Sequence, residues 1–182
     1  MIVSRRSSRV AFAVVIMASC ATLFLARGAR AFSAGNTAKM EETVRRYFEG
    51  VNQKDPDMIR SCFGETATIR DVCGINDTTR SVPAQDLVNR CMEFLAAHPD
   101  CKVDFYYGPE RGRNSDWVVA HWYETGTWSG ESCGIAPTHE PMACEGQTRF
   151  LVNPDTLKIS DFVVTRTFTE WEKKFLENQA QK

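Results

Sequence analysis

Residues 117–141 read WVVAHWYETGTWSGESCGIAPTHEP, and their first half has the composition of a β-strand. β-branched and aromatic side chains, which strands favour, fill most of residues 117–128, and no proline interrupts them before Pro137. At about 3.3 Å per residue, such a strand would cross a small domain. Gly126 lies inside it, where a glycine usually marks a bulge, a bend or a close approach of another backbone. The sequence therefore predicts one long central strand.

Periodic patterns predict the elements on either side of this strand. Apolar residues at helical spacing predict helices that begin near Ala38, at Asp55-Pro56 and at Pro83. Further strands are predicted over residues 66–71, 101–107, 142–152 and 158–168, and a last helix over residues 170–178. Thr169 and Glu172 have the spacing of a capping box at the start of that helix. The order of elements predicts an α+β fold in which helices cover one face of a curved, mostly antiparallel sheet.

Two short motifs in this region carry a resemblance to a known family. Residues 126–130 (GTWSG) and 134–138 (GIAPT) resemble the signature of SnoaL-like proteins of the NTF2-like superfamily, commonly G-T-H-x-G followed by G-I-P-P-T-G. Here Trp128 replaces the histidine, Ala136 the first proline and His139 the last glycine. The resemblance implies an NTF2-like cone, with the sheet packed on three N-terminal helices around an internal pocket. The family includes cyclases, isomerases, dehydratases and non-catalytic binders, so the fold leaves the activity open.

The beginning of the chain has the layout of a secretory signal peptide. Three arginines precede an uncharged apolar run at residues 10–26, and Ala29-Arg30-Ala31 provides a small-x-small cleavage site. The run is shorter than the roughly 20 residues of a spanning helix, although a signal anchor is the alternative. We expect a signal peptide at 1–31, a short transit-like or linker segment at 32–38, the SnoaL-like domain at 39–178 and a tail at 179–182.

The residue after the predicted cleavage site bears on the destination of the protein. Phe32, followed by the small, non-acidic residues 33–39, resembles the bipartite plastid-targeting signals of diatoms and related algae. We therefore expect a plastid protein with no membrane association after signal cleavage. Secretion, or residence in the lumen of the secretory pathway, is the alternative, and the sequon at Asn76 fits it.

Charge and motif content exclude several classes of function. The chain of 182 residues has 22 basic and 23 acidic side chains, and five of the arginines lie in the first 31 residues, which contain no acid. An acidic domain without a basic cluster argues against nucleic-acid binding. His98, His121 and His139 are far apart, and no Cys-x-x-Cys occurs, so we expect no metal site. No nucleotide-binding glycine motif is present, and the chemistry implied by the resemblance needs no cofactor.

Cysteines give a further expectation about the compartment. Removal of the leader leaves an even set of six, which suggests disulfides in an oxidising compartment. Neighbouring pairs are geometrically plausible: Cys62–Cys73, Cys91–Cys101 and Cys133–Cys144. In a plastid stroma we would expect thiols instead.

Two residues are the candidate acid–base groups. Asp71 ends the first predicted strand, where SnoaL-like proteins often have an Asp in a His/Arg-Asp pair. Desolvation at the pocket wall would raise the pKa of Asp71 so that it could transfer a proton. The alternative is that Asp71 caps the turn that follows the strand. His121 lies in the central strand and is suited to acid–base work near neutral pH, the alternative being a hydrogen-bonded sheet histidine. Strand alternation puts His121 on the face opposite Trp122, and leaves open which face lines the pocket.

Four further residues are the candidate ligand-binding groups. Trp128 offers one N–H donor and a large apolar face in place of the family's histidine, which favours a flat apolar or aromatic ligand. Tyr47, on the first helix, could donate a hydrogen bond to a ligand carbonyl, with core packing as the alternative. Trp122, on the central strand, is the third candidate. The fourth, Asp161, matches an acidic position of the family's last strand, with a solvent-facing strand residue as the alternative.

Together these features favour one of two functions. The first is a small-molecule-binding protein that acts as a cofactor-independent cyclase or isomerase on an apolar carbonyl compound by acid–base catalysis. The second is a non-catalytic NTF2-like module for ligand binding or dimerisation. The resemblance also implies a homodimer formed through the open face of the sheet.

Overall fold

The computed structural model describes residues 34–72, 79–132 and 134–180. The predicted signal peptide, Phe32, the sequon at Asn76 and two of the cysteines, Cys73 and Cys133, lie outside these residues. None of the helices within the described residues is long and apolar enough to cross a membrane.

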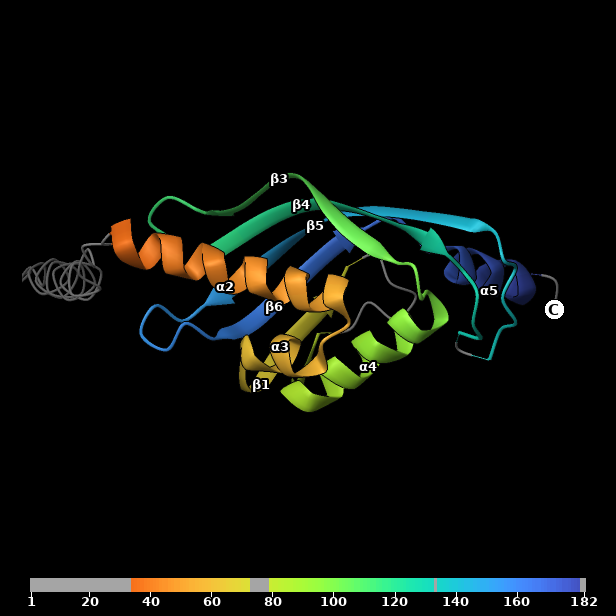
Figure 1. Ribbon diagram of the computed structural model, residues 1–182, viewed down its shortest axis with the longest axis horizontal. Helices are drawn as coiled ribbons and strands as arrows, with labels where there is room; N and C mark the ends of the chain where they lie inside the picture. Colours follow the sequence, from red (N-terminus) through yellow and green to blue (C-terminus); the bar gives the residue numbers. More distant parts are fainter. Residues whose placement is uncertain (1–33, 73–78, 133, 181–182) are drawn as a thin grey trace, which may run out of the picture. The chain divides into compact units, whose positions relative to one another are not determined.

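The described part of the chain is an α+β domain (Figure 1). Its elements are α2 (Ala34–Gln53), α3 (Pro56–Ser61), β1 (Phe63–Asp71), β2 (Arg80–Pro83), α4 (Ala84–Ala97), β3 (Lys102–Arg111), β4 (Trp117–Thr127), β5 (Pro141–Val152), β6 (Ile159–Arg166) and α5 (Glu170–Ala180). Helix α2 begins inside the segment expected to be a linker. The short strand β2 was not predicted, because four residues carry too little alternation to be recognised without their pairing to β1.

The sheet confirms the predicted mostly antiparallel arrangement. Its strand order is β2-β1-β6-β5-β4-β3, and the only parallel pair among these strands is β1 with β6. Strand β4 pairs with β5 along its whole length, from Trp117 opposite Leu151 to Thr127 opposite Pro141. The register passes through Gly126 without a bulge, and a Cβ there would lie 3.0 Å from the Cα of Cys101. Gly126 therefore permits a close backbone approach, and residues along β4 keep strict alternation between the two faces.

Helices α2, α3 and α4 cover one face of the sheet (Figure 1). Tyr47 and Phe48 of α2 pack against Phe150 of β5, with ring centroids 5.5 and 5.8 Å away. Phe150 also stacks on Phe162 of β6 at 5.6 Å with nearly parallel planes. The face of the sheet that meets these helices is called the inner face below, and the opposite face the outer face.

The last helix is fixed at its start by the side chain of Glu172. One carboxylate oxygen of Glu172 accepts hydrogen bonds from the backbone N–H of Thr169, at 2.8 Å, and from its hydroxyl, at 2.9 Å. The predicted capping interaction between these two residues is therefore present. Glu172 is only 2% exposed, although α5 lies at the end of the domain rather than over the core.

The three disulfides considered for an oxidising compartment are not formed by the described cysteines. Cys62, Cys91, Cys101 and Cys144 are all free thiols. Each of the three expected pairs therefore has at least one free member. In the pair whose members are both described, Cys101 is hydrogen-bonded to the carboxyl of Glu124 instead of being bonded to Cys91.

Candidate functional site

The inner face of β4 carries an acid among apolar residues. Val118, Ala120 and Trp122 alternate on this face and are buried, and Glu124 is the next residue in the same alternation. Its neighbours across the sheet are Val103 on β3 and Cys144 on β5. The partly buried carboxyl of Glu124 therefore points between the sheet and the helices.

The surroundings of Glu124 favour its neutral form more than water does. Burial raises the pKa of Glu124 to about 7, although the Arg166 cation and a hydrogen bond with the Cys101 thiol pull it down. Burial also raises the pKa values of the Cys91 and Cys101 thiols, so both stay protonated near neutral pH. A carboxyl with a pKa close to 7 can both accept and return a proton at neutral pH.

Tyr47 places a hydrogen-bond donor in the same region. Its ring is 9% exposed and packs edge-on against Phe48 and Phe63. Burial raises the pKa of Tyr47, with further contributions from Cys91 and Glu124, so the phenol keeps its proton. Among the described residues no hydrogen bond of its hydroxyl is found, and a phenol that keeps its proton can donate one.

Trp122 contributes its ring to the inner face. Its Nε1 donates to the hydroxyl of Thr148 at 2.8 Å, so the N–H is already satisfied. The ring lies over Gly146, where a Cβ would come within 2.9 Å of Trp122 Cζ2 and 2.8 Å of Arg166 Cβ. Gly146 thus leaves the room that Trp122 and Arg166 occupy side by side.

Arg166 is held by two carboxylates. Its Nε and Nη2 donate to Oδ2 of Asp71 at 3.0 and 2.6 Å, and its Nη1 and Nη2 donate to Glu172 at 2.7 and 2.8 Å. Nη1 also donates to the backbone carbonyl of Thr167 at 3.2 Å, so all five N–H groups of the guanidinium have acceptors. Two carboxylates against one guanidinium leave this cluster with a net negative charge.

The structure separates the two predicted acid–base residues. Asp71 lies on the inner face in its ion pair with Arg166, and its other oxygen, Oδ1, is buried without a hydrogen-bond partner among the described residues. His121 lies on the outer face, with its ring 4.9 Å from Tyr106 and 5.3 Å from Tyr107. The two side chains therefore do not meet, and a single ligand cannot contact both.

The predicted ligand-binding residues are divided in the same way. Tyr47 and Trp122 lie at the inner face, as described above. Asp161 alternates with the inner Phe162 on β6, so it lies on the outer side, where it accepts a hydrogen bond from Ser160 at 2.7 Å. Trp128 is fully buried in the connection after β4, and its Nε1 donates to the Gly130 carbonyl at 2.8 Å.

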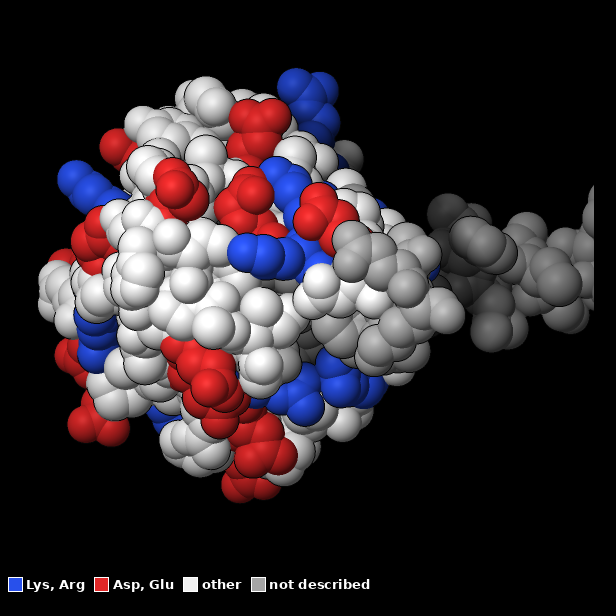
Figure 2. Space-filling view, turned by 90° about the vertical axis from the view of Figure 1, so that its right-hand side faces the viewer, with Lys and Arg blue, Asp and Glu red and all other residues white. Residues whose placement is uncertain are grey.

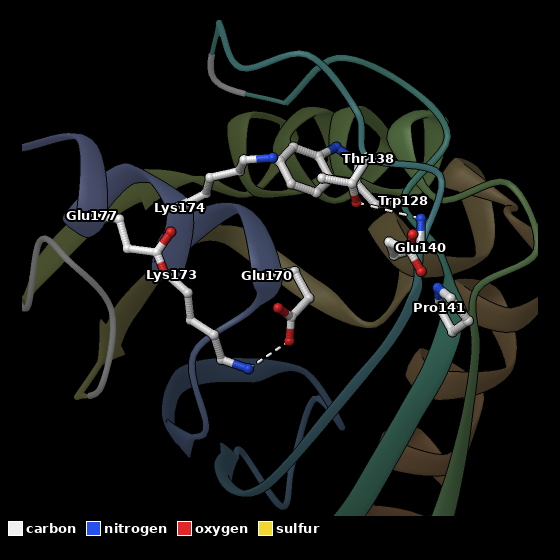
Figure 3. Close-up of a pocket in the computed structure, with 8 residues that line it drawn as sticks. All are labelled: Trp128, Thr138, Glu140, Pro141, Glu170, Lys173, Lys174 and Glu177. Carbon is white, nitrogen blue, oxygen red and sulfur yellow. Dashed lines mark hydrogen bonds and ion pairs between the residues drawn. The ribbon is translucent and has the colours of Figure 1, made fainter.

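Trp128 borders a separate hollow between that connection and α5 (Figure 3). The hollow has a volume of about 220 Å³ and is lined by Trp128, Thr138, Glu140, Pro141, Glu170, Lys173, Lys174 and Glu177. Lys173 is ion-paired with Glu170 at 2.5 Å. Figure 2 shows acidic and basic side chains side by side in the upper part of this end of the domain and a run of acidic side chains in its lower part.

Sequence reasoning overlooked Glu124, although its signal was present. Residues 118, 120 and 122 are apolar and share one face, so an acid at residue 124 falls on the apolar face. Arg166 carried no comparable signal. Its role depends on pairing between β5 and β6 and on the return of α5, which local patterns do not specify.

No family model matches the chain, and no curated protein matches its sequence. Solved structures do match its fold. AclR, a proposed hydroxylase from Streptomyces galilaeus, aligns with a TM-score of 0.59 at 18% identity, covering 72% of this chain and 76% of that protein. A proposed SnoaL-like polyketide cyclase from Jannaschia sp. CCS1 aligns with a TM-score of 0.61 at 18% identity, covering 77% and 91%. Another from Shewanella denitrificans OS-217 aligns at 0.60 and 13% identity, covering 78% and 96%.

These matches and the geometry above define the class of fold. The domain has the NTF2-like cone of SnoaL-like polyketide cyclases, with a six-stranded curved sheet packed on three helices. At this level of identity the likeness concerns the fold, and the activity has to be argued from the residues at the inner face.

Proposed function

We propose that the domain binds a neutral, largely apolar carbonyl compound between the sheet and the helices and catalyses a cofactor-independent proton transfer, as an isomerase or cyclase of the polyketide cyclase-like kind. The observation that carries this proposal is the pairing of two groups at the inner face. Glu124 is a carboxyl with a pKa raised to about 7, and Tyr47 is a protonated phenol whose hydroxyl has no partner among the described residues.

The two groups suit the two halves of an enolisation. The Glu124 carboxylate takes a proton from the carbon next to the carbonyl, and the electron pair of that C–H bond moves into the enolate. Tyr47 donates to the carbonyl oxygen, where negative charge develops. Return of the proton from Glu124 to a different carbon gives an isomer. Attack of the enolate carbon on a second carbonyl of the same molecule, followed by protonation of the new alkoxide, closes a ring.

The charges around the site favour a neutral ligand over an anionic one. Arg166 is the nearby cation, but its N–H groups are all occupied by Asp71, Glu172 and the Thr167 carbonyl. No guanidinium donor is therefore left to bind a carboxylate or phosphate. The surplus negative charge of the cluster also repels such groups.

This proposal gives Asp71 and His121 different roles from those first expected. The acid–base role passes to Glu124. Asp71 helps to hold Arg166, the cation that acts on Glu124, in place. The unpartnered Oδ1 of Asp71 remains available as an acceptor for a ligand hydroxyl. His121 belongs to the outer face and takes no part in the reaction.

Hydrogen–deuterium exchange tests the reaction even while the substrate is unidentified. A panel of neutral cyclic and aromatic ketones with acidic α-protons is incubated with the protein in D2O and followed by NMR. We expect at least one ketone to exchange faster with the wild type than in buffer, and Glu124→Gln to slow this exchange by about 100-fold or more. Glu145→Gln, an outer-face acid hydrogen-bonded to Tyr106, is the matched control and should exchange at the wild-type rate. Equal exchange by wild type and Glu124→Gln would refute the acid–base role.

A non-catalytic binding module is the second candidate, and Trp128 favours it. The residue stands where SnoaL-like proteins commonly have a histidine, and a buried indole cannot transfer protons. In that case native mass spectrometry of protein purified from its own source should find a retained apolar compound. The same compound should show no exchange with either wild type or Glu124→Gln.

We propose that the partner of the domain is a second copy bound through the outer face. Tyr106 and Tyr107 are 56% and 46% exposed there, and they form one aromatic patch with His121 and Tyr123. Exposed aromatic clusters of this kind are typical of protein interfaces. Light scattering should give a dimer for wild type and a monomer for Tyr106→Ser/Tyr107→Ser. A wild-type monomer at high concentration would rule the dimer out.

We propose the plastid as the destination, with secretion as the alternative. The resemblance of Phe32 and residues 33–39 to bipartite plastid-targeting signals supports this proposal. The mass of the protein from its own source decides between them. A start soon after Phe32 with free thiols supports the plastid, and glycosylation at Asn76 supports the secretory pathway.

A further inference from the structure

The last helix is connected to the interior of the domain by one buried acid. Glu172 lies in the first turn of α5, and its side chain is 2% exposed. Its carboxylate forms a bidentate pair with Arg166 on β6 at 2.7 and 2.8 Å, and it also caps its own helix at Thr169. The position of α5 and the position of the Arg166 guanidinium therefore depend on each other.

Across the sheet, Gly146 is the residue that lies between Arg166 on β6 and the strand that carries Glu124, β4. Gly146 on β5 lies opposite Arg166 on β6 and opposite Trp122 on β4. A Cβ at Gly146 would come within 2.8 Å of Arg166 and 2.9 Å of Trp122, so the side chains from the two flanking strands approach each other across it. Cys144, the preceding inner residue of β5, is the direct cross-strand neighbour of Glu124.

The other groups that face Glu124 are neutral near pH 7. They come from four elements and their borders: Tyr47 from α2, Cys91 from α4, Cys101 just before β3 and Cys144 from β5. Burial raises the pKa of each of these groups, so none carries charge at neutral pH. The charged group that acts on Glu124 is Arg166, whose guanidinium is held by the Asp71 and Glu172 carboxylates. Lys54, which directly follows α2, acts on the neighbouring Cys101 thiol.

We propose that Arg166 is the positioning residue that sets the charge at the interior site, and that helix α5 holds it in place through Glu172. This inference rests on the proposed acid–base role of Glu124. Glu172 and Asp71 fix the guanidinium at one distance from Glu124 and also offset part of its positive charge. The last helix thereby adjusts the protonation of a group on the central strand.

The proposal predicts opposite effects for two substitutions in the same ion-pair cluster. Replacing Arg166 by Met removes the cation and leaves two carboxylates, so Glu124 should bind its proton more tightly. Replacing Glu172 by Gln removes a negative charge but keeps an amide oxygen that can still accept from Thr169, so Glu124 should bind its proton less tightly. A merely structural cluster would give neither change, or the same change in both variants.

The test is a titration of the intact domain labelled with ¹³C at the glutamate carboxyl carbons and followed by NMR. Glu124→Gln identifies the signal of Glu124. We expect Arg166→Met to raise the midpoint of its titration by about one pH unit, and Glu172→Gln to lower it. Glu170→Gln, which breaks only the surface pair with Lys173 on the same helix, is the matched control and should leave the midpoint unchanged.

The outcomes separate this inference from the proposed function. If Arg166→Met does not fold, Glu172→Gln decides alone, and an unchanged or raised midpoint in that variant overturns the proposal. The titration needs no substrate, so it can succeed when no ketone exchanges deuterium. Exchange that depends on Glu124, combined with unmoved midpoints in both variants, would sustain the proposed function and refute the positioning role.

Discussion

Replacing Glu124 by Gln should make the domain more stable at neutral pH while it removes the acid–base group. The folded protein raises the pKa of this carboxyl from 4.5 to about 7, because burial penalises its charged form. Since one pKa unit corresponds to about 1.4 kcal/mol, the ionised side chain costs the folded state about 3 kcal/mol. Gln has nearly the same shape as the protonated acid and carries no such cost.

The sign of this effect fixes its pH window. Below pH 4.5 the carboxyl is protonated in both the folded and the unfolded chain, so the substitution changes little. As the pH rises, the unfolded chain releases its proton first, and the folded state loses stability until Glu124 ionises near pH 7. The advantage of Glu124→Gln should therefore grow between about pH 4.5 and pH 7 and stay constant above it.

Urea unfolding of both proteins at several pH values measures this difference directly. The quantity of interest is the difference in the free energy of unfolding between wild type and Glu124→Gln, since other titrating groups affect both proteins alike. We expect it to rise from near zero at low pH to about 3 kcal/mol at pH 8. A difference that does not vary with pH, or a variant that is less stable at pH 8, would refute the reasoning.

Three further changes test the packing around the site. Gly146→Ala should destabilise the domain by about 1–3 kcal/mol, because the added Cβ would meet the Thr165 carbonyl oxygen at 2.7 Å. It should also alter the tryptophan fluorescence, because the same Cβ would lie 2.9 Å from Trp122 Cζ2. A variant as stable as the wild type would contradict these contacts. Phe150→Ala should cost about 3–5 kcal/mol in urea unfolding, since Phe150 is fully buried at the centre of the aromatic core. Burial opposes ionisation of Glu172, but hydrogen bonds from Arg166 lower its pKa overall. The stability lost in Glu172→Gln should therefore be largest at neutral pH and disappear as the pH falls through that lowered pKa. An equal loss of stability at all pH values would argue against this ion pair.

Local patterns predicted the fold well because they act within single elements. The β-branched and aromatic composition of residues 117–128 predicted the central strand, the spacing of Thr169 and Glu172 predicted the start of the last helix, and helical periodicity predicted α2 and α4. The short strand β2 was missed because its pairing to β1, rather than its composition, makes it a strand. The free thiol of Cys101 was also beyond the sequence, since spacing alone does not say whether a thiol meets another thiol or a carboxyl.

The candidate site was harder to predict because it depends on which face of the sheet the helices cover. His121 and Glu124 lie on the same strand, and the alternation places them on opposite faces. The choice between the faces is made by α2, whose apolar side chains Tyr47 and Phe48 pack against Phe150. The apolar residues 118, 120 and 122 marked the face of Glu124 in the sequence, and the contact with α2 shows that this face is the one the helices cover.

A comparison of Asp71→Asn with Glu124→Gln decides which acid performs the proton transfer. If Asp71 is the acid–base group, Asp71→Asn should abolish deuterium exchange into the ketone while Glu124→Gln retains it. The structure favours the reverse, because Oδ2 of Asp71 is committed to Arg166 at 2.6 Å. Asn cannot pair with the guanidinium as a carboxylate does, so we expect Asp71→Asn to lose some stability and to shift the pH profile of exchange to lower pH. Its maximal exchange rate should nevertheless stay within about tenfold of wild type, far above that of Glu124→Gln.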